Sequence, residues 1–138
     1  MYKFLSIILL LLFLTFSGCE QKTLTLSGNV SFDGNPLNDG GIVFVPTDNL
    51  QTEYKEKNFN GKYSISIPTT ITGKMLVCIY ALRQEKSKNY SVSEEELKLN
   101  PSAGMMSVMY IPKQYNTEST LTVEVSPTTT VFDFKLEK

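Results

Sequence analysis

Histidine is absent from this sequence of 138 residues. It is the side chain that titrates near neutral pH, and it is the commonest metal ligand in proteins. Its absence excludes Ser-His-Asp and Cys-His catalysis, because both mechanisms need an imidazole as the base. The histidine-dependent enzyme classes are therefore excluded. We assign no catalytic residue and no cofactor to this sequence.

Cysteine and clustered positive charge are also scarce. Cys19 and Cys78 are the two cysteines, and Cys19 is assigned below to lipid attachment. One remaining thiol cannot form a disulfide framework or complete a zinc site. Cys78 lies in an apolar run, which predicts a buried, packed side chain. The formal net charge is -1 and no run of Lys or Arg forms a basic stripe, so we expect no nucleic-acid partner.

The N-terminal segment has the order of parts found in an export signal. Lys3 precedes a largely apolar run over residues 4–16, and Ser17-Gly18-Cys19 follows. The run is too short for a transmembrane helix, which needs roughly 20 residues. The small residues before Cys19 resemble a bacterial lipobox, with Phe16 where leucine is usual. We expect a lipoprotein signal peptide over residues 1–18, lipidation at Cys19, and a short tether over residues 19–23.

Lipidation would hold the mature protein outside the cytoplasm at a bacterial membrane. Two or more acyl chains anchor a protein stably, whereas one chain is marginal. Glu20 stands where inner-membrane lipoproteins often have aspartate, which favours the outer membrane over the inner one. The alternative is an ordinary signal peptide that is followed by a chance cysteine. Both interpretations predict an extracytoplasmic protein.

Residues 24–138 are expected to form one domain with a single core. Apolar residues alternate with polar ones along much of it, which is typical of strands with one buried face. Asp33-Gly34 and Asn60-Gly61 are hairpin signals. The runs over residues 42–45 and 75–82 are apolar on both faces, which predicts strands covered on each side. Short strands, frequent turns and no long amphipathic helix predict an all-β, antiparallel β-sandwich of about seven strands.

A long polar insertion over residues 83–107 interrupts the regular strand spacing. Within it, Ser93 is followed three residues later by Glu96, which matches a capping box. This pattern predicts a short helix that ends at about Leu99. Insertions of this kind lie on the surface of a domain.

Several segments follow one another in a characteristic order. They are Leu26-Ser27-Gly28-Asn29-Val30, Asp33-Gly34-Asn35-Pro36-Leu37, Gly40-Gly41-Ile42-Val43-Phe44-Val45-Pro46 and Asn60-Gly61-Lys62-Tyr63. Together they resemble a carboxypeptidase regulatory-like domain. Ile111-Pro112-Lys113-Gln114-Tyr115 and the ending Phe132-Asp133-Phe134-Lys135-Leu136 are similar to small planctomycete lipoproteins of this type. The resemblance implies a transthyretin-like sandwich of seven strands that performs no chemistry itself.

Four tyrosines in or beside expected loops form the candidate binding surface: Tyr54, Tyr90, Tyr110 and Tyr115. Aromatic rings at such positions can stack on sugars or fill a partner's pocket. Tyr115 has an alternative role, because its hydroxyl could tie a loop to the sandwich.

Two clusters that suggest metals have simpler structural explanations. Glu94, Glu95 and Glu96, with Glu85, would suit calcium, but consecutive carboxylates at a helix start also suit the helix dipole. The thioethers of Met105, Met106 and Met109 would suit Cu(I). Without a histidine or a nearby cysteine, an apolar patch explains these methionines. We expect no metal site.

The sequence favours a non-catalytic, lipid-anchored cell-envelope protein with a β-sandwich that serves as a binding or structural module. The expected partners are the membrane, through the N-terminal lipid, and an envelope protein or glycan. Two alternatives stay open, a small-ligand or glycan carrier and an accessory domain of a peptidase or hydrolase system. Asp33 and Asp39 would be candidate acids for hydrolysis, although turn formation accounts for both.

Overall fold

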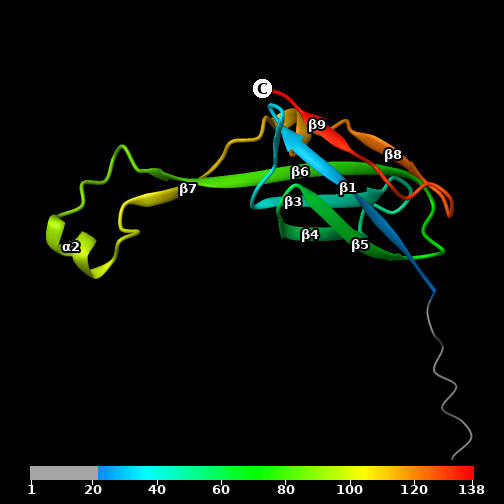
Figure 1. The fold of residues 1–138 in the computed structure, drawn as a ribbon, viewed down its shortest axis with the longest axis horizontal. Helices are drawn as coiled ribbons and strands as arrows, with labels where there is room; N and C mark the ends of the chain where they lie inside the picture. Colours follow the sequence, from blue (N-terminus) through cyan, green and yellow to red (C-terminus); the bar gives the residue numbers. More distant parts are fainter. Residues whose placement is uncertain (1–21) are drawn as a thin grey trace, which may run out of the picture.

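Two β-sheets packed face to face form the body of the protein (Figure 1). The structure, a computed structural model, describes residues 22–138, so Cys19 and the expected signal peptide lie outside the described residues. The four-stranded sheet consists of β1 (Thr23–Phe32), β2 (Asn35–Pro36), β5 (Lys62–Pro68) and β9 (Phe134–Leu136). The five-stranded sheet consists of β3 (Gly40–Pro46), β4 (Tyr54–Phe59), β6 (Gly73–Lys86), β7 (Met105–Met109) and β8 (Thr122–Val125). The helices are α2 (Glu94–Leu99) and the 3-10 turn η1 (Lys113–Tyr115).

The predicted all-β sandwich is confirmed, with two differences in detail. The described residues contain nine strands instead of about seven, because β2 is a two-residue strand and β6 continues into a pairing with β7. In addition, β9 runs parallel to β1, with Val30 opposite Phe134. The chain reaches β9 by crossing over from β8 in the other sheet, so the two strands are not joined by a hairpin.

The core lies between the sheets and consists of the inward-facing residues of the alternating strands. Tyr63, Ile65 and Ile67 are buried on one face of β5, as the alternation predicts, while the serines between them are exposed. The ring of Tyr63 lies at the centre of an aromatic group, 5.6 Å from the centroid of Phe44 and 6.2 Å from that of Phe134. Aromatic rings at these separations attract one another in addition to burying apolar area.

The outer face of the five-stranded sheet differs from the prediction. The apolar runs over residues 42–45 and 75–82 predict strands covered on both sides, but Val43, Leu76 and Cys78 are only half-buried. Residues 22–138 form two layers, and none of them adds a third layer over this face. Cys78 therefore lies on the outer face of the sheet instead of in the core, although partial burial still raises the pKa of its thiol.

The two hairpin signals have different outcomes. Asp33-Gly34 forms the predicted two-residue turn between β1 and β2, and both residues have positive φ angles of 48° and 80°. Asn60-Gly61 does not form a hairpin, because β4 pairs with β3 while β5 pairs with β1 in the opposite sheet. The Gly61 N–H instead donates to the Leu37 carbonyl at 2.8 Å, which fixes a crossing between the layers.

A close approach at Gly28 holds the segment before β9 against β1. A Cβ atom at this position would lie 1.9 Å from the carbonyl oxygen of Phe132. The same oxygen accepts a hydrogen bond from the Tyr63 hydroxyl at 2.8 Å. Next to it, Asp133 accepts from the backbone N–H and the side chain of Asn29 at 2.7 and 2.9 Å, which lowers the pKa of its carboxyl. The sequence thus needs glycine at position 28 because another backbone occupies the space.

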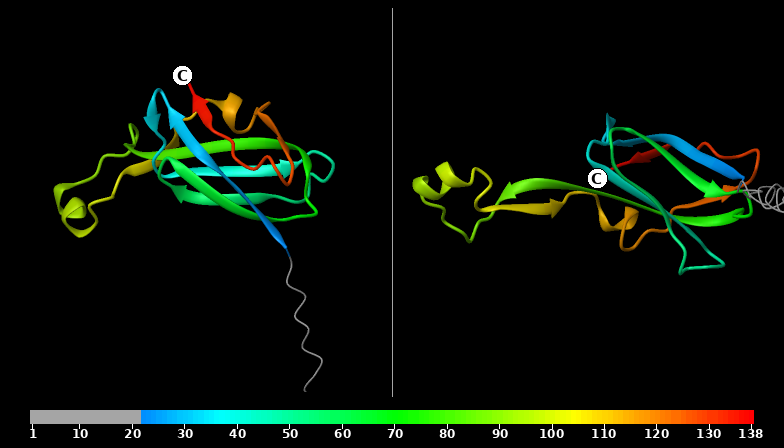
Figure 2. Two further views of the ribbon diagram at one scale, coloured as in Figure 1. Left: turned by 45° about the vertical axis from the view of Figure 1, so that its right-hand side comes forward. Right: turned by 90° about the horizontal axis from the view of Figure 1, so that it is seen from below.

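The arm, defined here as residues 82–109, projects from one end of the sandwich (Figures 1 and 2). Along its 14 residues β6 pairs with β8, then with β3, and finally with β7. Both ends of the predicted insertion are therefore strands instead of loop. The predicted helix is confirmed as α2, with the Ser93 hydroxyl accepting from the Glu96 N–H at 3.2 Å. The Glu96 carboxylate accepts from Tyr90 at 3.1 Å.

Candidate functional site

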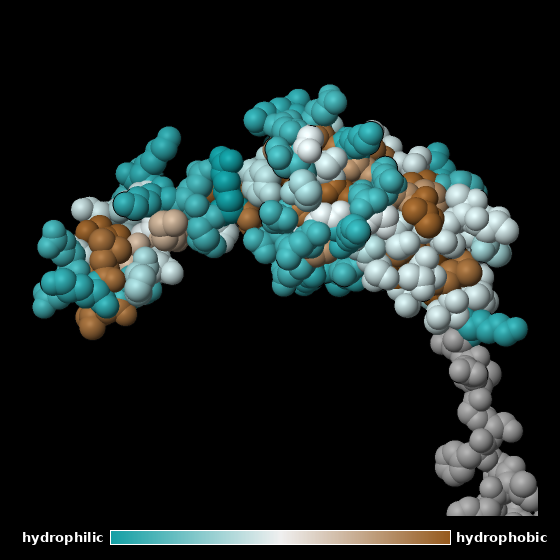
Figure 3. All heavy atoms as spheres, viewed as in Figure 1, coloured by the Kyte–Doolittle hydropathy of each residue, from teal (hydrophilic) through white to brown (hydrophobic). Residues whose placement is uncertain are grey.

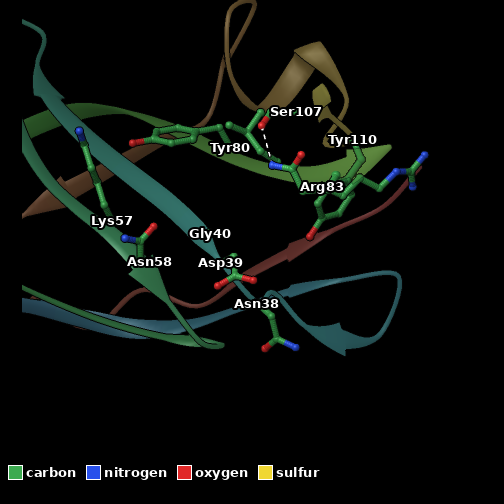
Figure 4. Close-up of a pocket in the computed structure, with 11 residues that line it drawn as sticks. Asn38, Asp39, Gly40, Lys57, Asn58, Tyr80, Arg83, Ser107 and Tyr110 are labelled. Atoms are coloured by element: carbon green, nitrogen blue, oxygen red, sulfur yellow. Dashed lines mark hydrogen bonds between the residues drawn. The ribbon is translucent and has the colours of Figure 1, made fainter. Parts of the chain in front are cut away.

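An open groove of about 900 Å³ lies where β6 leaves the sandwich to enter the arm. Its walls come from the start of β3, the end of β4, the end of β6, β7 and the segment that follows β7 (Figure 4). Four strands and the segment after β7 thus supply side chains to one concave surface. We call this surface the groove.

Tyr80 contributes an aromatic ring to the groove, and Gly41 determines where that ring lies. The two residues are register partners on β6 and β3. A Cβ atom at position 41 would lie 2.2 Å from Cζ of Tyr80, so the ring lies directly over the glycine backbone. Glycine leaves this space to the ring, and a side chain at position 41 would displace the ring from it. The ring remains half-exposed towards the groove.

Arg83, at the base of the arm, and Tyr110, which directly follows the arm, lie side by side in the groove (Figure 4). The guanidinium carbon of Arg83 lies 5.6 Å from the centre of the Tyr110 ring, within the range of a cation–π contact. Burial and the nearby carboxylate of Asp39 raise the pKa of the Tyr110 hydroxyl, whereas Arg83 acts in the opposite direction. Arg83 also donates from Nε to Glu85 at 2.6 Å. These contacts hold the guanidinium over the ring.

Two residues of the groove have an uncommon backbone conformation. Asp39 has a φ angle of 53° and Asn58 has one of 60°. They are two of the three non-glycine residues with positive φ within residues 22–138. This conformation costs roughly 1–2 kcal/mol per residue, although Asn and Asp tolerate it best. Strain of this kind concentrates at functional sites, which singles out this groove.

The remaining polar side chains are amides and single charges. Gln84 donates from Nε2 to the Ser107 hydroxyl at 2.8 Å, so both side chains have a fixed orientation. Among residues 22–138, Asp39 is the one carboxylate that lines the groove, and Lys57 and Arg83 are its cations. General acid–base hydrolysis uses a pair of carboxylates. These side chains can orient a polar ligand by hydrogen bonds, and the aromatic rings can supply contact area.

The four predicted tyrosines do not lie together. Tyr110 lines the groove. Tyr54 is half-buried and packs against the core, and Tyr115 accepts at its hydroxyl from the Glu137 N–H at 3.2 Å. This hydrogen bond supports the alternative role of Tyr115, in which its hydroxyl holds a loop against the sandwich. Tyr90 is exposed at the tip of the arm, where its hydrogen bond to Glu96 raises the pKa of its hydroxyl.

Sequence reasoning missed Tyr80 and Asn58 as site residues, and it considered Asp39 only as a hydrolytic acid and not as part of a groove. The apolar run around Tyr80 predicts a covered strand, and Asp39 and Asn58 are ordinary turn formers in sequence. One signal was present, because Gly40-Gly41 stands at the start of an apolar strand, where glycine often marks the close approach of another group.

The clusters considered for metals are separated by their positions in the fold. Within residues 22–138 no group of three or more Cys, Asp or Glu side chains is arranged to hold a metal ion. Met106 points to the opposite face of β7 from Met105 and Met109, since successive side chains of a strand alternate. The thioethers of Met105, Met106 and Met109 thus cannot all meet at one ion.

No helix among residues 22–138 has both the length and the apolar character needed to cross a membrane. Comparison of the chain with models of protein families, with curated proteins and with solved structures gave no match.

Proposed function

We propose that this protein is a lipid-anchored, non-catalytic binding protein of the bacterial cell envelope, and that its ligand is a glycan held in the groove. The groove carries this proposal. It combines two tyrosine rings with side-chain amides, one carboxylate and two cations. Such groups orient a hydroxyl-rich ligand by hydrogen bonds and provide flat apolar area for its ring faces.

The anchor is proposed from the sequence, and the position of the first described residue in the fold is compatible with it. The described chain begins at Lys22, at the end of the sandwich opposite the arm (Figure 1). A lipid on Cys19 would therefore tether the far end of the molecule. The groove and the arm would then point away from the membrane that holds the lipid. The resemblance to carboxypeptidase regulatory-like lipoproteins is in keeping with such a non-catalytic role.

The glycan proposal is tested by titrating the detergent-solubilised, full-length protein with soluble oligosaccharides. Three probes separate the chemistries: a neutral N-acetylated chito-oligosaccharide, a neutral malto-oligosaccharide and an acidic oligogalacturonate. With two cations and one carboxylate in the groove, we expect the acidic probe to bind more tightly than the malto-oligosaccharide. Calorimetry gives the affinity, and ligand-observed NMR shows which sugar protons contact the protein.

Matched tyrosine variants locate the binding site. Tyr80→Ala removes the ring in the groove, and we expect about tenfold weaker binding, which corresponds to about 1.4 kcal/mol. Tyr90→Ala removes an exposed ring at the tip of the arm and serves as the control. Binding by none of the three probes, or equal losses in the two variants, contradicts the proposal.

A further inference from the structure

β7 forms one edge of the arm, and within residues 22–138 it pairs with β6 alone. The arm is a two-stranded ribbon that stands clear of the sandwich (Figure 2). Four of its large apolar side chains are exposed: Leu82 at 49%, Met105 at 37%, Met106 at 49% and Met109 at 42%. Apolar residues are also visible at its tip (Figure 3). A ribbon of two strands without a third strand or a covering layer is only marginally stable in water.

The hydrogen bonds at both ends of the ribbon determine which backbone groups of β7 point towards β6. At the tip, the Ser87 N–H donates to the Gly104 carbonyl at 2.7 Å, and at the base the Tyr110 N–H donates to the Ala81 carbonyl at 3.3 Å. Hydrogen-bonded pairs alternate with unbonded pairs in an antiparallel ladder. The even-numbered residues 104–110 therefore direct their backbone groups at β6.

The odd-numbered residues of β7 direct their backbone groups away from β6. These are Met105, Ser107 and Met109. The Met105 N–H is used within the tip, where it donates to the Ser102 carbonyl at 3.1 Å. Both backbone groups of Ser107 and of Met109, together with the Met105 carbonyl, thus form an open row of donors and acceptors. This row is a template for one more strand.

β7 lacks the features that usually protect such an edge. Its sequence Met-Met-Ser-Val-Met contains no charge and no proline, and its pairing with β6 contains no bulge. Natural edge strands are commonly blocked by lysine, proline or a bulge. An apolar, unblocked edge on a projecting arm favours pairing with another strand.

We propose that this strand is β7 of a second copy of the protein, paired antiparallel about a two-fold axis at Ser107. Ser107 then faces Ser107 of the partner subunit, and Met105 faces Met109 of the partner subunit. The two Ser107 residues can exchange a pair of hydrogen bonds, and each Met109 N–H can donate to the free carbonyl of Met105 of the partner subunit. The pairing is isologous and closed, as in most homodimers.

The edge is complementary to itself, because in this register no like charges meet and the outward donors and acceptors face one another. On one face of the arm, Arg83 lies opposite Val108 and Glu85 lies opposite Met106. In the dimer, Val108 comes to lie beside Met106 of the partner subunit. Across the four strands of the dimer arm, one row of side chains therefore runs from Arg83 through Val108 and Met106 of the partner subunit to Glu85 of the partner subunit. The two-fold axis generates a second row of the same composition. The middle of each row is apolar, and no row places like charges at its two ends.

The dimer would also extend the groove. Leu82 lines the groove and lies opposite Met109 on the same face of the ribbon. In the proposed register, Met105 of the partner subunit continues this row beyond Met109. Each copy thus supplies an apolar side chain next to the groove of the other.

A cysteine at the two-fold axis tests the register directly. In a Cys78→Ala background, Ser107→Cys would place two thiols on facing residues whose Cα atoms are about 5.5 Å apart, within the range of about 4.4–6.8 Å that disulfides need. We expect mild oxidation of the full-length protein in membranes to give a covalent dimer. Ser102→Cys in the same background is the control, because this exposed turn residue lies far from the axis. Equal cross-linking of both variants, or none of Ser107→Cys, overturns the proposal.

A proline provides a second measurement that leaves the arm itself intact. Met109→Pro removes an outward N–H in each copy and spares the bonds to β6. Loss of two hydrogen bonds predicts a dimer dissociation constant about 30-fold higher by sedimentation of the detergent-solubilised protein. Met109→Ala keeps the N–H and is the matched control. Wild-type protein that sediments as a monomer, or a Met109→Pro dimer as tight as that of Met109→Ala, also overturns the proposal. No glycan enters either assay, so the outcome is independent of the proposed ligand.

Discussion

Substitution of Gly28 by alanine tests whether the contact between β1 and the segment before β9 stabilises the sandwich. The added Cβ would lie 1.9 Å from the Phe132 oxygen and 2.7 Å from its carbonyl carbon. Both neighbours are backbone atoms, so no side-chain rotation can relieve the overlap. The segment must therefore move away from β1 by more than 1 Å, because ordinary contacts of a Cβ are longer than about 3 Å.

This movement breaks three hydrogen bonds. They are Ser27 N–H to Thr130 C=O at 3.0 Å, Phe132 N–H to Ser27 C=O at 2.9 Å, and Tyr63 O–H to Phe132 C=O at 2.8 Å. At about 1 kcal/mol each, their loss lowers the free energy of unfolding by about 3 kcal/mol. The total stability of such a domain is only about 5–15 kcal/mol, so the effect is easily measured.

Urea denaturation gives this free energy, and Gly34→Ala provides the matched control. Gly34 has a φ of 80°, but a Cβ atom added there would have no neighbour within 4 Å, so alanine meets conformational strain without a clash. The expected cost at position 34 is about 1–2 kcal/mol. A cost for Gly28→Ala that does not exceed that of Gly34→Ala would refute the argument from the backbone contact.

Four further predictions concern the groove, an acid-sensitive contact, the arm and the anchor. Gly41→Ala leaves Tyr80 in the chain but displaces its ring; we expect about tenfold weaker binding of whichever oligosaccharide the wild type binds best, measured by calorimetry. The lowered pKa of Asp133 stabilises the fold above the ordinary carboxyl pKa of about 3.9, and this stability is lost as the pH falls through the lowered value. Melting temperatures between pH 2 and 6 should therefore fall less steeply in Asp133→Asn than in the wild type. Ser93→Ala removes the helix cap and should weaken amide-exchange protection in α2 by about 1 kcal/mol, with little change in the sandwich. Cys19→Ser should release the protein from membranes, and intact mass should show acyl chains on the wild type alone.

The local features of the fold were predictable because they depend on neighbouring residues. Alternation identified the buried face of β5, and Ser93 with Glu96 identified the start of α2. Asp33-Gly34 identified a turn because its residues accept positive φ angles. In each case the residues that carry the sequence pattern are the same residues that form the predicted element.

Features that depend on strand partners were not predictable in the same way. Asn60-Gly61 has the composition of a hairpin, but the partners of β4 and β5 lie in opposite sheets. The charged residues that follow Leu82 have the composition of a loop. They form a strand because they pair with β7, and this partner cannot be identified from the local sequence. The same limit applies to the groove, since the register of β3 and β6 brings Tyr80 over Gly41.

The continuity of β6 has a mechanical consequence. A pull on the tip of the arm runs along the axis of β6, and the hydrogen bonds to β3 and β8 stand perpendicular to that axis. Such bonds are loaded together in shear and do not open one after another as in a zipper. The arm can thus transmit force into the body of the molecule while the sandwich stays folded, which suits the proposed anchor at one end and the proposed binding surfaces at the other.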